Sequence, residues 1–187
     1  MVITLASNSP RRCELLKGLG IPFQVRVQKG IDESYPDGLS AAEIPVHISR
    51  QKATAYDLLD EELLITADTI VYLEGEVLGK PKDAEDACRM LQKLSGKTHQ
   101  VVTGVTLRSA SLLHSFSCTT NVTFATLSSE EILHYVQTYK PFDKAGAYGI
   151  QEWIGYVGVT HLEGSYFNVM GLPVQRLYTE LKKLQII

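Results

Sequence analysis

"LLITADTIVYLEGEVLG", residues 63–79, is the stretch of the chain that decides the fold. Nearly every residue from 63 to 73 is apolar or β-branched, which is typical of a buried β-strand. A short polar turn, Glu74 and Gly75, then leads into "EVLG", so we predict a β-hairpin here. Only Asp68 interrupts the apolar run.

Asp68 is the residue of this stretch that most needs an explanation. A carboxylate among buried neighbours is costly unless it is paired, binds a metal ion or takes up a proton. It would be unremarkable as the cap of a turn at a strand end, but the β-prone residues continue through Tyr72. We therefore interpret Asp68 as a functional carboxylate.

Helical and strand patterns alternate on both sides of the hairpin. Capping residues and apolar spacing predict helices that start after Ser9, span 41–59, start after Asp83, run from Ser128 to Tyr139, and start at Pro173. Strand patterns occupy residues 2–6, 23–27, 98–108 and 112–127, and the region up to about Met170 is β-prone. This alternation predicts an α/β fold with a mixed sheet.

The composition excludes several classes of protein. The chain has 187 residues, 44% of them hydrophobic, and a formal net charge of −3, which suits a globular domain and disfavours nucleic acid or an anionic membrane as partner. Cys13, Cys88 and Cys118 have no spacing that suggests a disulfide framework or a zinc site. Because no export signal or membrane span is evident, we expect a cytoplasmic protein, and a homodimer is left open.

"LASNSPRRCELL", residues 5–16, places two arginines at the start of a predicted helix. The helix N-terminus already carries partial positive charge, so an anion there would make the arrangement favourable. The hydroxyl of Ser7 and the guanidinium groups of Arg11 and Arg12 are suitable donors to phosphate. The alternative is an ordinary helix cap with solvated arginines.

Three further charged residues fit the same chemistry. Lys52 and Lys80 would each be ordinary surface charges if taken alone, and Glu33 is either a loop charge or a metal ligand. Together with Asp68 they supply positive groups for a polyphosphate and carboxylates that place a divalent metal and activate water. The sequence therefore indicates phosphoryl chemistry.

Seven motifs occur in the order and spacing found in Maf-like nucleoside triphosphate pyrophosphatases: "LASNSPRRCELL", "ISRQKATA", "ADTIV", "GKPKDAEDACRML", "LSGKTHQVVTGV", "DKAGAYGIQ" and "GSYFNVMGLP". The resemblance runs from about residue 3 to residue 180. It implies an inosine-triphosphatase-like (Maf/Ham1) architecture over residues 1–187: one domain, whose mixed sheet, with flanking helices, bends across two lobes with an active cleft between them. It also implies hydrolysis of a nucleoside triphosphate to the monophosphate and pyrophosphate with Mg²⁺, Mn²⁺ or Co²⁺.

The resemblance also implies a role for each candidate residue. Asp68 matches the proton acceptor of the family, and Glu33 and Asp68 are the expected metal residues. The remaining positions form two groups, which are Ser7, Arg11, Lys52 and Lys80 for phosphate binding, and Arg12, Thr69 and Gln151 for substrate specificity.

Arg12, Thr69 and Gln151 resemble the branch that acts on dTTP and UTP, with modified pyrimidine nucleotides as further candidate substrates. The 7-methyl-GTP branch differs at these positions. A second alternative is a nucleotide-sensing regulator of cell division and septum formation in which hydrolysis is vestigial. Asn8 departs from the family, in which glycine is common, and asparagine tolerates left-handed backbone geometry.

Overall fold

The computed structural model describes residues 1–187, which divide into two compact units. Unit 1 comprises residues 1–69, 103–118 and 171–187, and unit 2 comprises residues 70–102 and 119–170. The strands of the sheet are β1 (Val2–Leu5), β2 (Gln24–Val25), β3 (Glu62–Leu73), β4 (Glu76–Leu78), β5 (Thr98–Arg108), β6 (Leu113–Phe124) and β7 (Val159–Glu163).

The sheet is mixed, as the sequence predicts. Its strand order is β2-β1-β3-β5-β6-β7, with β4 paired to β3. β1 is parallel to β2 and to β3, whereas β4 is antiparallel to β3 and β7 is antiparallel to β6. Glu74 and Gly75 both have positive φ, 50° and 92°, which is the geometry of a tight hairpin turn. The predicted hairpin is therefore confirmed.

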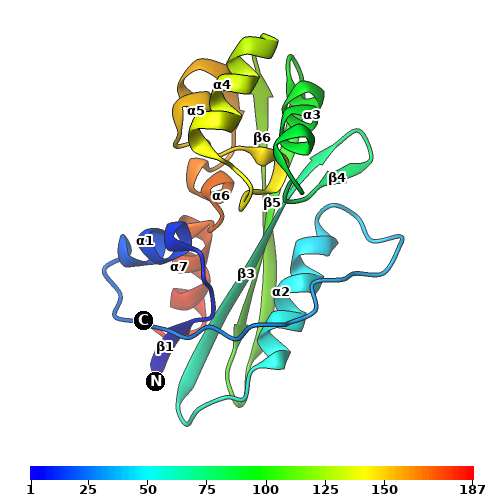
Figure 1. Cartoon of the computed structure of the whole chain (residues 1–187). Coiled ribbons are helices and arrows are strands. Elements are labelled where there is room, and N and C mark those ends of the chain that lie inside the picture. Colours follow the sequence, from blue (N-terminus) through cyan, green and yellow to red (C-terminus); the bar gives the residue numbers. More distant parts are fainter. The chain divides into compact units, whose positions relative to one another are not determined.

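Unit 1 contains three helices, which are α1 (Pro10–Lys17), α2 (Glu43–Ala55) and α7 (Val174–Lys183). In Figure 1, α1 and α7 lie on one side of the strands of this unit and α2 lies on the other. At Gly104 of β5, an added Cβ would lie 2.3 Å from the carbonyl carbon of Pro45. Glycine is thus required where the backbone of α2 rests on the sheet.

Unit 2 contains the remaining helical segments, which are α3 (Ala84–Leu94), α4 (Ser129–Tyr139), η1 (Ala145–Ala147), α5 (Trp153–Gly158) and α6 (Tyr166–Met170). α3 packs beside α4 (Figure 1). Their buried faces, including Leu91 and Tyr135, share one apolar core with Phe124 and Ile154. The predicted helix starts are confirmed, because Asp83 caps α3 and Ser128 forms a capping box with Glu131.

Three predictions about elements need correction. The region from 152 to 170 is not continuously β-prone, because α5 and α6 flank the short strand β7. The helix predicted over 41–59 is shorter, ending before Tyr56, whose backbone is extended and whose hydroxyl accepts a 2.8 Å hydrogen bond from the Gln28 amide. Of residues 23–27, only Gln24 and Val25 pair with β1, at the edge of the sheet.

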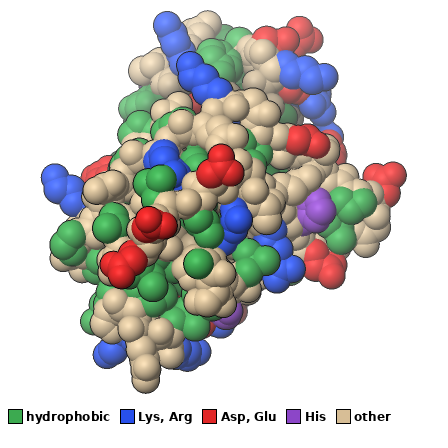
Figure 2. All heavy atoms as spheres, turned by 90° about the horizontal axis from the view of Figure 1, so that it is seen from below, with side chains coloured by type: hydrophobic (Ala, Val, Ile, Leu, Met, Phe, Trp, Pro, Cys, Tyr) green, Lys and Arg blue, Asp and Glu red, His purple; other side chains and the backbone are tan.

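The remaining features are the charged surface, the cysteines, the character of the helices and the loop before α1. Charged side chains of both signs are interspersed on the face drawn in Figure 2. None of the three cysteines forms a disulfide, and all three are half-buried. No helix has both the length and the apolar character needed to cross a bilayer. Asn8 has no positive φ, so the loop before α1 forms without the left-handed geometry that a glycine there would allow.

Candidate active site

Asp68 is half-buried on β3 and forms an ion pair. Its side chain is 13% exposed, and its Oδ1 atom lies 2.7 Å from the Nζ atom of Lys52. Lys52 projects from α2 and is 14% exposed, so it is not the ordinary surface charge that its sequence context allows. The ion pair offsets the cost of placing a carboxylate inside an apolar strand.

Glu33 completes a cluster of three charges. Its Oε1 atom lies 2.8 Å from the Nζ atom of Lys52, so one ammonium group holds two carboxylates. Glu33 comes from the irregular segment between β2 and α2, and with 49% of its side chain exposed it is the more accessible carboxylate. The cluster brings together three predicted site residues that are far apart in the sequence.

The donor set of this cluster fits a hard divalent cation. Mg²⁺ is commonly bound by one or two carboxylates together with substrate phosphates and water. Glu33 and Asp68 supply such a pair, and no group of three or more His, Cys, Asp or Glu side chains is placed to hold a metal ion by itself. An ion held here would therefore share its coordination with the substrate.

The start of α1 is built by serine side chains. The Ser9 hydroxyl caps the helix by accepting the Arg12 amide at 3.4 Å, and Pro10 follows at the first helical position. The buried Ser7 hydroxyl accepts the Ser9 amide at 3.2 Å. Arg11 lies half-buried in the first turn of the helix, and that turn contains no acidic residue of its own. This is a helix start suited to an anion.

The Arg12 guanidinium is fixed by two hydrogen bonds. Its Nε donates to the Gly171 carbonyl at 2.8 Å, and its Nη2 donates to the Thr69 hydroxyl at 3.1 Å. Burial lowers the pKa of Arg12, and the Asp68 carboxylate opposes that effect. Because arginine only donates, Thr69 accepts here and can give its hydroxyl hydrogen to Thr103, 2.9 Å away. The Thr69 hydroxyl therefore has a fixed role in each hydrogen bond, whereas an unconstrained hydroxyl could either donate or accept.

The other two predicted site residues belong to unit 2. Lys80 is exposed and follows β4, and the preceding carbonyl, that of Gly79, accepts the Gly146 amide at 3.1 Å. The Lys80 segment is thereby tied to the "DKAGAYGIQ" loop. Gln151, at the end of that loop, is half-buried, and its Oε1 atom is fully buried without a hydrogen-bond partner.

Two contributors to the site are not identifiable one by one from the sequence. Thr103 is buried on β5 and bonds to Thr69, and Gly171 offers its carbonyl to Arg12. Both fall inside stretches quoted as motifs, "LSGKTHQVVTGV" and "GSYFNVMGLP". The motifs are the only sequence signal for them, because a threonine in a strand and a glycine before a helix are ordinary by themselves.

The architecture is shared with a solved α/β protein. The structure of a HAM1 protein from Coxiella burnetii superposes with a TM-score of 0.51, covering 98% of this chain and 100% of that chain at 14% sequence identity. This confirms the Ham1-like fold expected from the sequence.

The family follows from the sequence comparisons. The model of the family described as "Maf-like protein" matches residues 2–184. The chain belongs to this family. It is 64% identical over 184 residues to a "dTTP/UTP pyrophosphatase" of Phocaeicola vulgatus, covering 97% of this chain and 95% of the relative. It is 59% identical, with the same coverage, to a protein of the same name from Bacteroides thetaiotaomicron.

Proposed function

We propose that this protein is a nucleoside triphosphate pyrophosphatase that hydrolyses dTTP and UTP to the nucleoside monophosphate and pyrophosphate. The observation that carries the proposal is the Asp68–Lys52–Glu33 cluster, in which a half-buried carboxylate is held by a lysine on a neighbouring helix. The names of the two relatives, at 64% and 59% identity, support the same substrates.

Asp68 is the base in this proposal. Its carboxylate accepts a proton from the water that attacks the α-phosphorus, while the Lys52 ammonium at 2.7 Å keeps the carboxylate oriented. The bond between the α-phosphorus and the bridging oxygen breaks, so pyrophosphate leaves as one group. Cationic donors from Arg11, Lys52 and Lys80, with the Ser7 hydroxyl, bind the phosphates and stabilise the charge that develops on them.

A divalent cation, Mg²⁺, Mn²⁺ or Co²⁺, is part of the proposal. Glu33 and Asp68 are the residues that would hold it, because they supply the carboxylate pair described above. When bound, such an ion neutralises phosphate charge and lowers the pKa of bound water.

Arg12, Thr69 and Gln151 select the base. Uracil and thymine present two carbonyl oxygens on either side of one N3–H group, so a matching pocket needs donors and one acceptor. Arg12 supplies donors only, and its direction is fixed by Gly171 and Thr69. Gln151 supplies both an NH₂ group and a carboxamide oxygen.

The experiment is a substrate panel with product analysis. UTP, dTTP, CTP, GTP and 7-methyl-GTP are each incubated with the protein and Mg²⁺, Mn²⁺ or Co²⁺, in H₂¹⁸O. We expect the highest kcat/KM for UTP and dTTP, with ¹⁸O in the monophosphate and none in the pyrophosphate. Orthophosphate and a diphosphate as first products would contradict the proposed bond cleavage. A preference for 7-methyl-GTP would assign the chain to the 7-methyl-GTP branch of the family. Binding of nucleotide without turnover would favour the nucleotide-sensing regulator.

A further inference from the structure

Gln151 lies in a tight turn, and its side-chain oxygen accepts no hydrogen bond. It is the third residue of the turn Gly149–Glu152, in which the Glu152 amide donates to the Gly149 carbonyl at 3.0 Å. The Gln151 Oε1 atom is buried and has no partner. Burying an acceptor without a partner is unfavourable, so such an atom in a candidate site is suited to a donor that a ligand brings.

Tyr135 of α4 holds both ends of this turn with one oxygen atom. Its hydroxyl accepts the Gly149 amide at 3.0 Å and donates to a carboxylate oxygen of Glu152. The tyrosine is fully buried. Burial, together with the hydrogen bond to Glu152, raises the pKa of Tyr135, so the hydroxyl remains protonated and able to donate.

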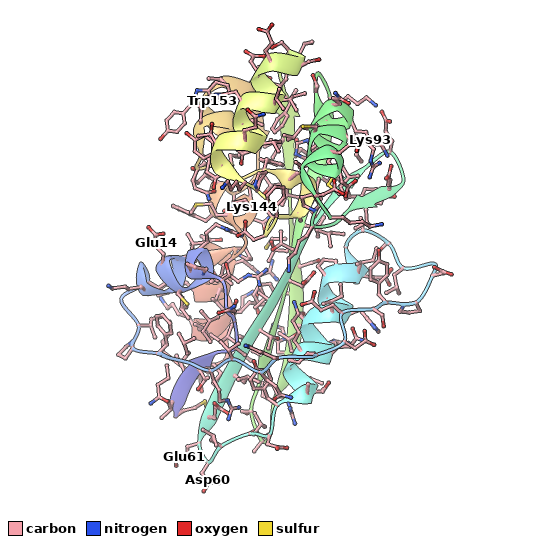
Figure 3. The ribbon with its side chains drawn as sticks, viewed as in Figure 1. Glu14, Asp60, Glu61, Lys93, Lys144 and Trp153 are labelled. Carbon is pink, nitrogen blue, oxygen red and sulfur yellow. The ribbon has the colours of Figure 1, made fainter.

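Lys144 supports the same carboxylate from the other side. Its Nζ atom lies 3.2 Å from Glu152 Oε1, and its side chain is only 10% exposed. Figure 3 shows Lys144 in the segment that follows α4 and Trp153 at the start of α5. Glu152 therefore has a hydrogen-bond donor on one oxygen and a cation on the other, and its position is fixed.

The space around Gly149 shows how closely the turn is packed. A Cβ atom added there would lie 3.0 Å from Gln151 Nε2 and 3.0 Å from Glu152 Cδ. The Gln151 carboxamide thus folds back over the glycine, beside the carboxylate that Tyr135 and Lys144 hold. A shift of that carboxylate would therefore change the packing around the Gln151 carboxamide.

We propose that Tyr135 is a positioning residue for base selection, which, with Glu152 and Lys144, fixes the Gly149–Glu152 turn so that the Gln151 carboxamide oxygen receives the N3–H of uracil or thymine. This inference rests on the proposed function. Cytosine carries an acceptor at N3, so it would meet the buried oxygen with like polarity. A correctly held Gln151 therefore favours UTP over CTP.

The test compares two tyrosines of the same helix. Tyr135→Phe removes the bridging hydroxyl and keeps the ring, which is stacked on Tyr139 at 5.1 Å between ring centroids. We expect Tyr135→Phe to narrow the UTP-to-CTP ratio of kcat/KM by about tenfold, mainly by raising the KM for UTP. Tyr139→Phe is the matched control and keeps the wild-type ratio.

A double-mutant cycle separates positioning from general support of the fold. In a Gln151→Ala background, Tyr135→Phe should cause no further narrowing, because its effect passes through Gln151. An equal loss on UTP and CTP, an unchanged ratio, or a full additional effect in the Gln151→Ala background each overturns the inference. If Tyr135→Phe does not fold, Glu152→Gln is tested in its place. We then expect Glu152→Gln to narrow the UTP-to-CTP ratio of kcat/KM, and an unchanged ratio overturns the inference.

The wild-type protein distinguishes failure of this inference from failure of the proposed function. If the wild type releases no pyrophosphate, or does not prefer UTP to CTP, the proposed function is wrong and this inference falls with it. If the wild type prefers UTP and Tyr135→Phe keeps that preference, only the positioning role is wrong.

Discussion

Arg12 shows how a charge that is unfavourable by local rules is accommodated. It adds positive charge at the start of α1, where the helix already carries some. In the structure its guanidinium bonds to the Gly171 carbonyl and the Thr69 hydroxyl, and the Asp68 carboxylate opposes the lowering of its pKa by burial. Arg12 is therefore a donor of fixed direction, which suits recognition of a base better than a mobile surface charge would.

Asp68→Asn should lower turnover severely and leave the fold intact. The amide has nearly the shape of the carboxylate and can still accept from Lys52 at the position of Oδ1, but it cannot take a proton from water. Loss of a general base lowers the rate by about 10²–10⁴-fold. The measurement is kcat for UTP, with circular dichroism and thermal unfolding to confirm folding.

Asp60→Asn is the matched control for Asp68→Asn. Asp60 is an exposed carboxylate in the loop before β3, labelled in Figure 3, and its amide variant should keep the wild-type kcat. A folded Asp68→Asn variant with near wild-type kcat would remove Asp68 from the mechanism.

Among the helices and turns, those defined by local signals are the ones that the sequence predicts well. Ser128 and Glu131 satisfy each other's backbone groups, so the start of α4 depends on no distant contact. The Glu74–Gly75 turn is likewise local. By contrast, α5 and α6 are too short for apolar spacing to reveal them, and neighbouring glycines and β-branched residues favour a strand reading instead.

The candidate site also contains both kinds of feature: some follow from local sequence, and others depend on contacts between distant segments. Asp68 is identifiable from sequence because a carboxylate inside an apolar strand is costly wherever that strand lies. Its pairing with Lys52, and the pairing of Lys52 with Glu33, depend on how α2 and the segment before it fold against β3. The hydrogen bond from Thr69 to Thr103 joins neighbouring strands, β3 and β5, and no local pattern predicts it.

Gly104→Ala should displace α2 and so disturb the Asp68–Lys52 pair. The added methyl group would lie 2.3 Å from a backbone carbon of Pro45, and backbone cannot move aside as a flexible side chain can. Overpacking of this kind destabilises proteins by about 1–3 kcal/mol. We expect a lower free energy of unfolding by urea and a loss of kcat/KM beyond what the remaining folded fraction explains.

Gly79→Ala is the control for stability at Gly104. Gly79 has no atom within 4 Å of an added Cβ and no positive φ, so its substitution should leave the free energy of unfolding nearly unchanged. If Gly104→Ala were as stable and as active as the wild type, the close contact between β5 and α2 would not govern the position of Lys52.

For the chain as a whole, the division into two units affects how stability must be measured. A chain with two compact units need not unfold in a single step, so one midpoint does not describe it. Trp153, the only tryptophan, lies on α5 in unit 2. Its fluorescence therefore follows the unfolding of that unit separately, whereas circular dichroism follows both units.

The stability of unit 2 should fall as the pH is lowered from about 6.5 to about 4. The upper value is the ordinary pKa of histidine, and the lower value is the pKa of His99 in the folded protein. His99 is buried beside Phe124 and Tyr148, and desolvation lowers its pKa to about 4. Between these pH values the unfolded chain binds a proton that the folded chain does not, so protonation favours unfolding. The full effect is about 3 kcal/mol, and above pH 6.5 it vanishes.

The measurement is urea unfolding followed by Trp153 fluorescence at several pH values between 4 and 7.5. His99→Gln should lower stability at every pH but reduce the slope of the free energy of unfolding against pH. His161→Gln removes an exposed histidine of the same unit, on β7, and should keep the wild-type slope. An unchanged slope in His99→Gln would show that other groups cause the acid sensitivity, because the substitution removes the buried imidazole that the unfolded chain protonates.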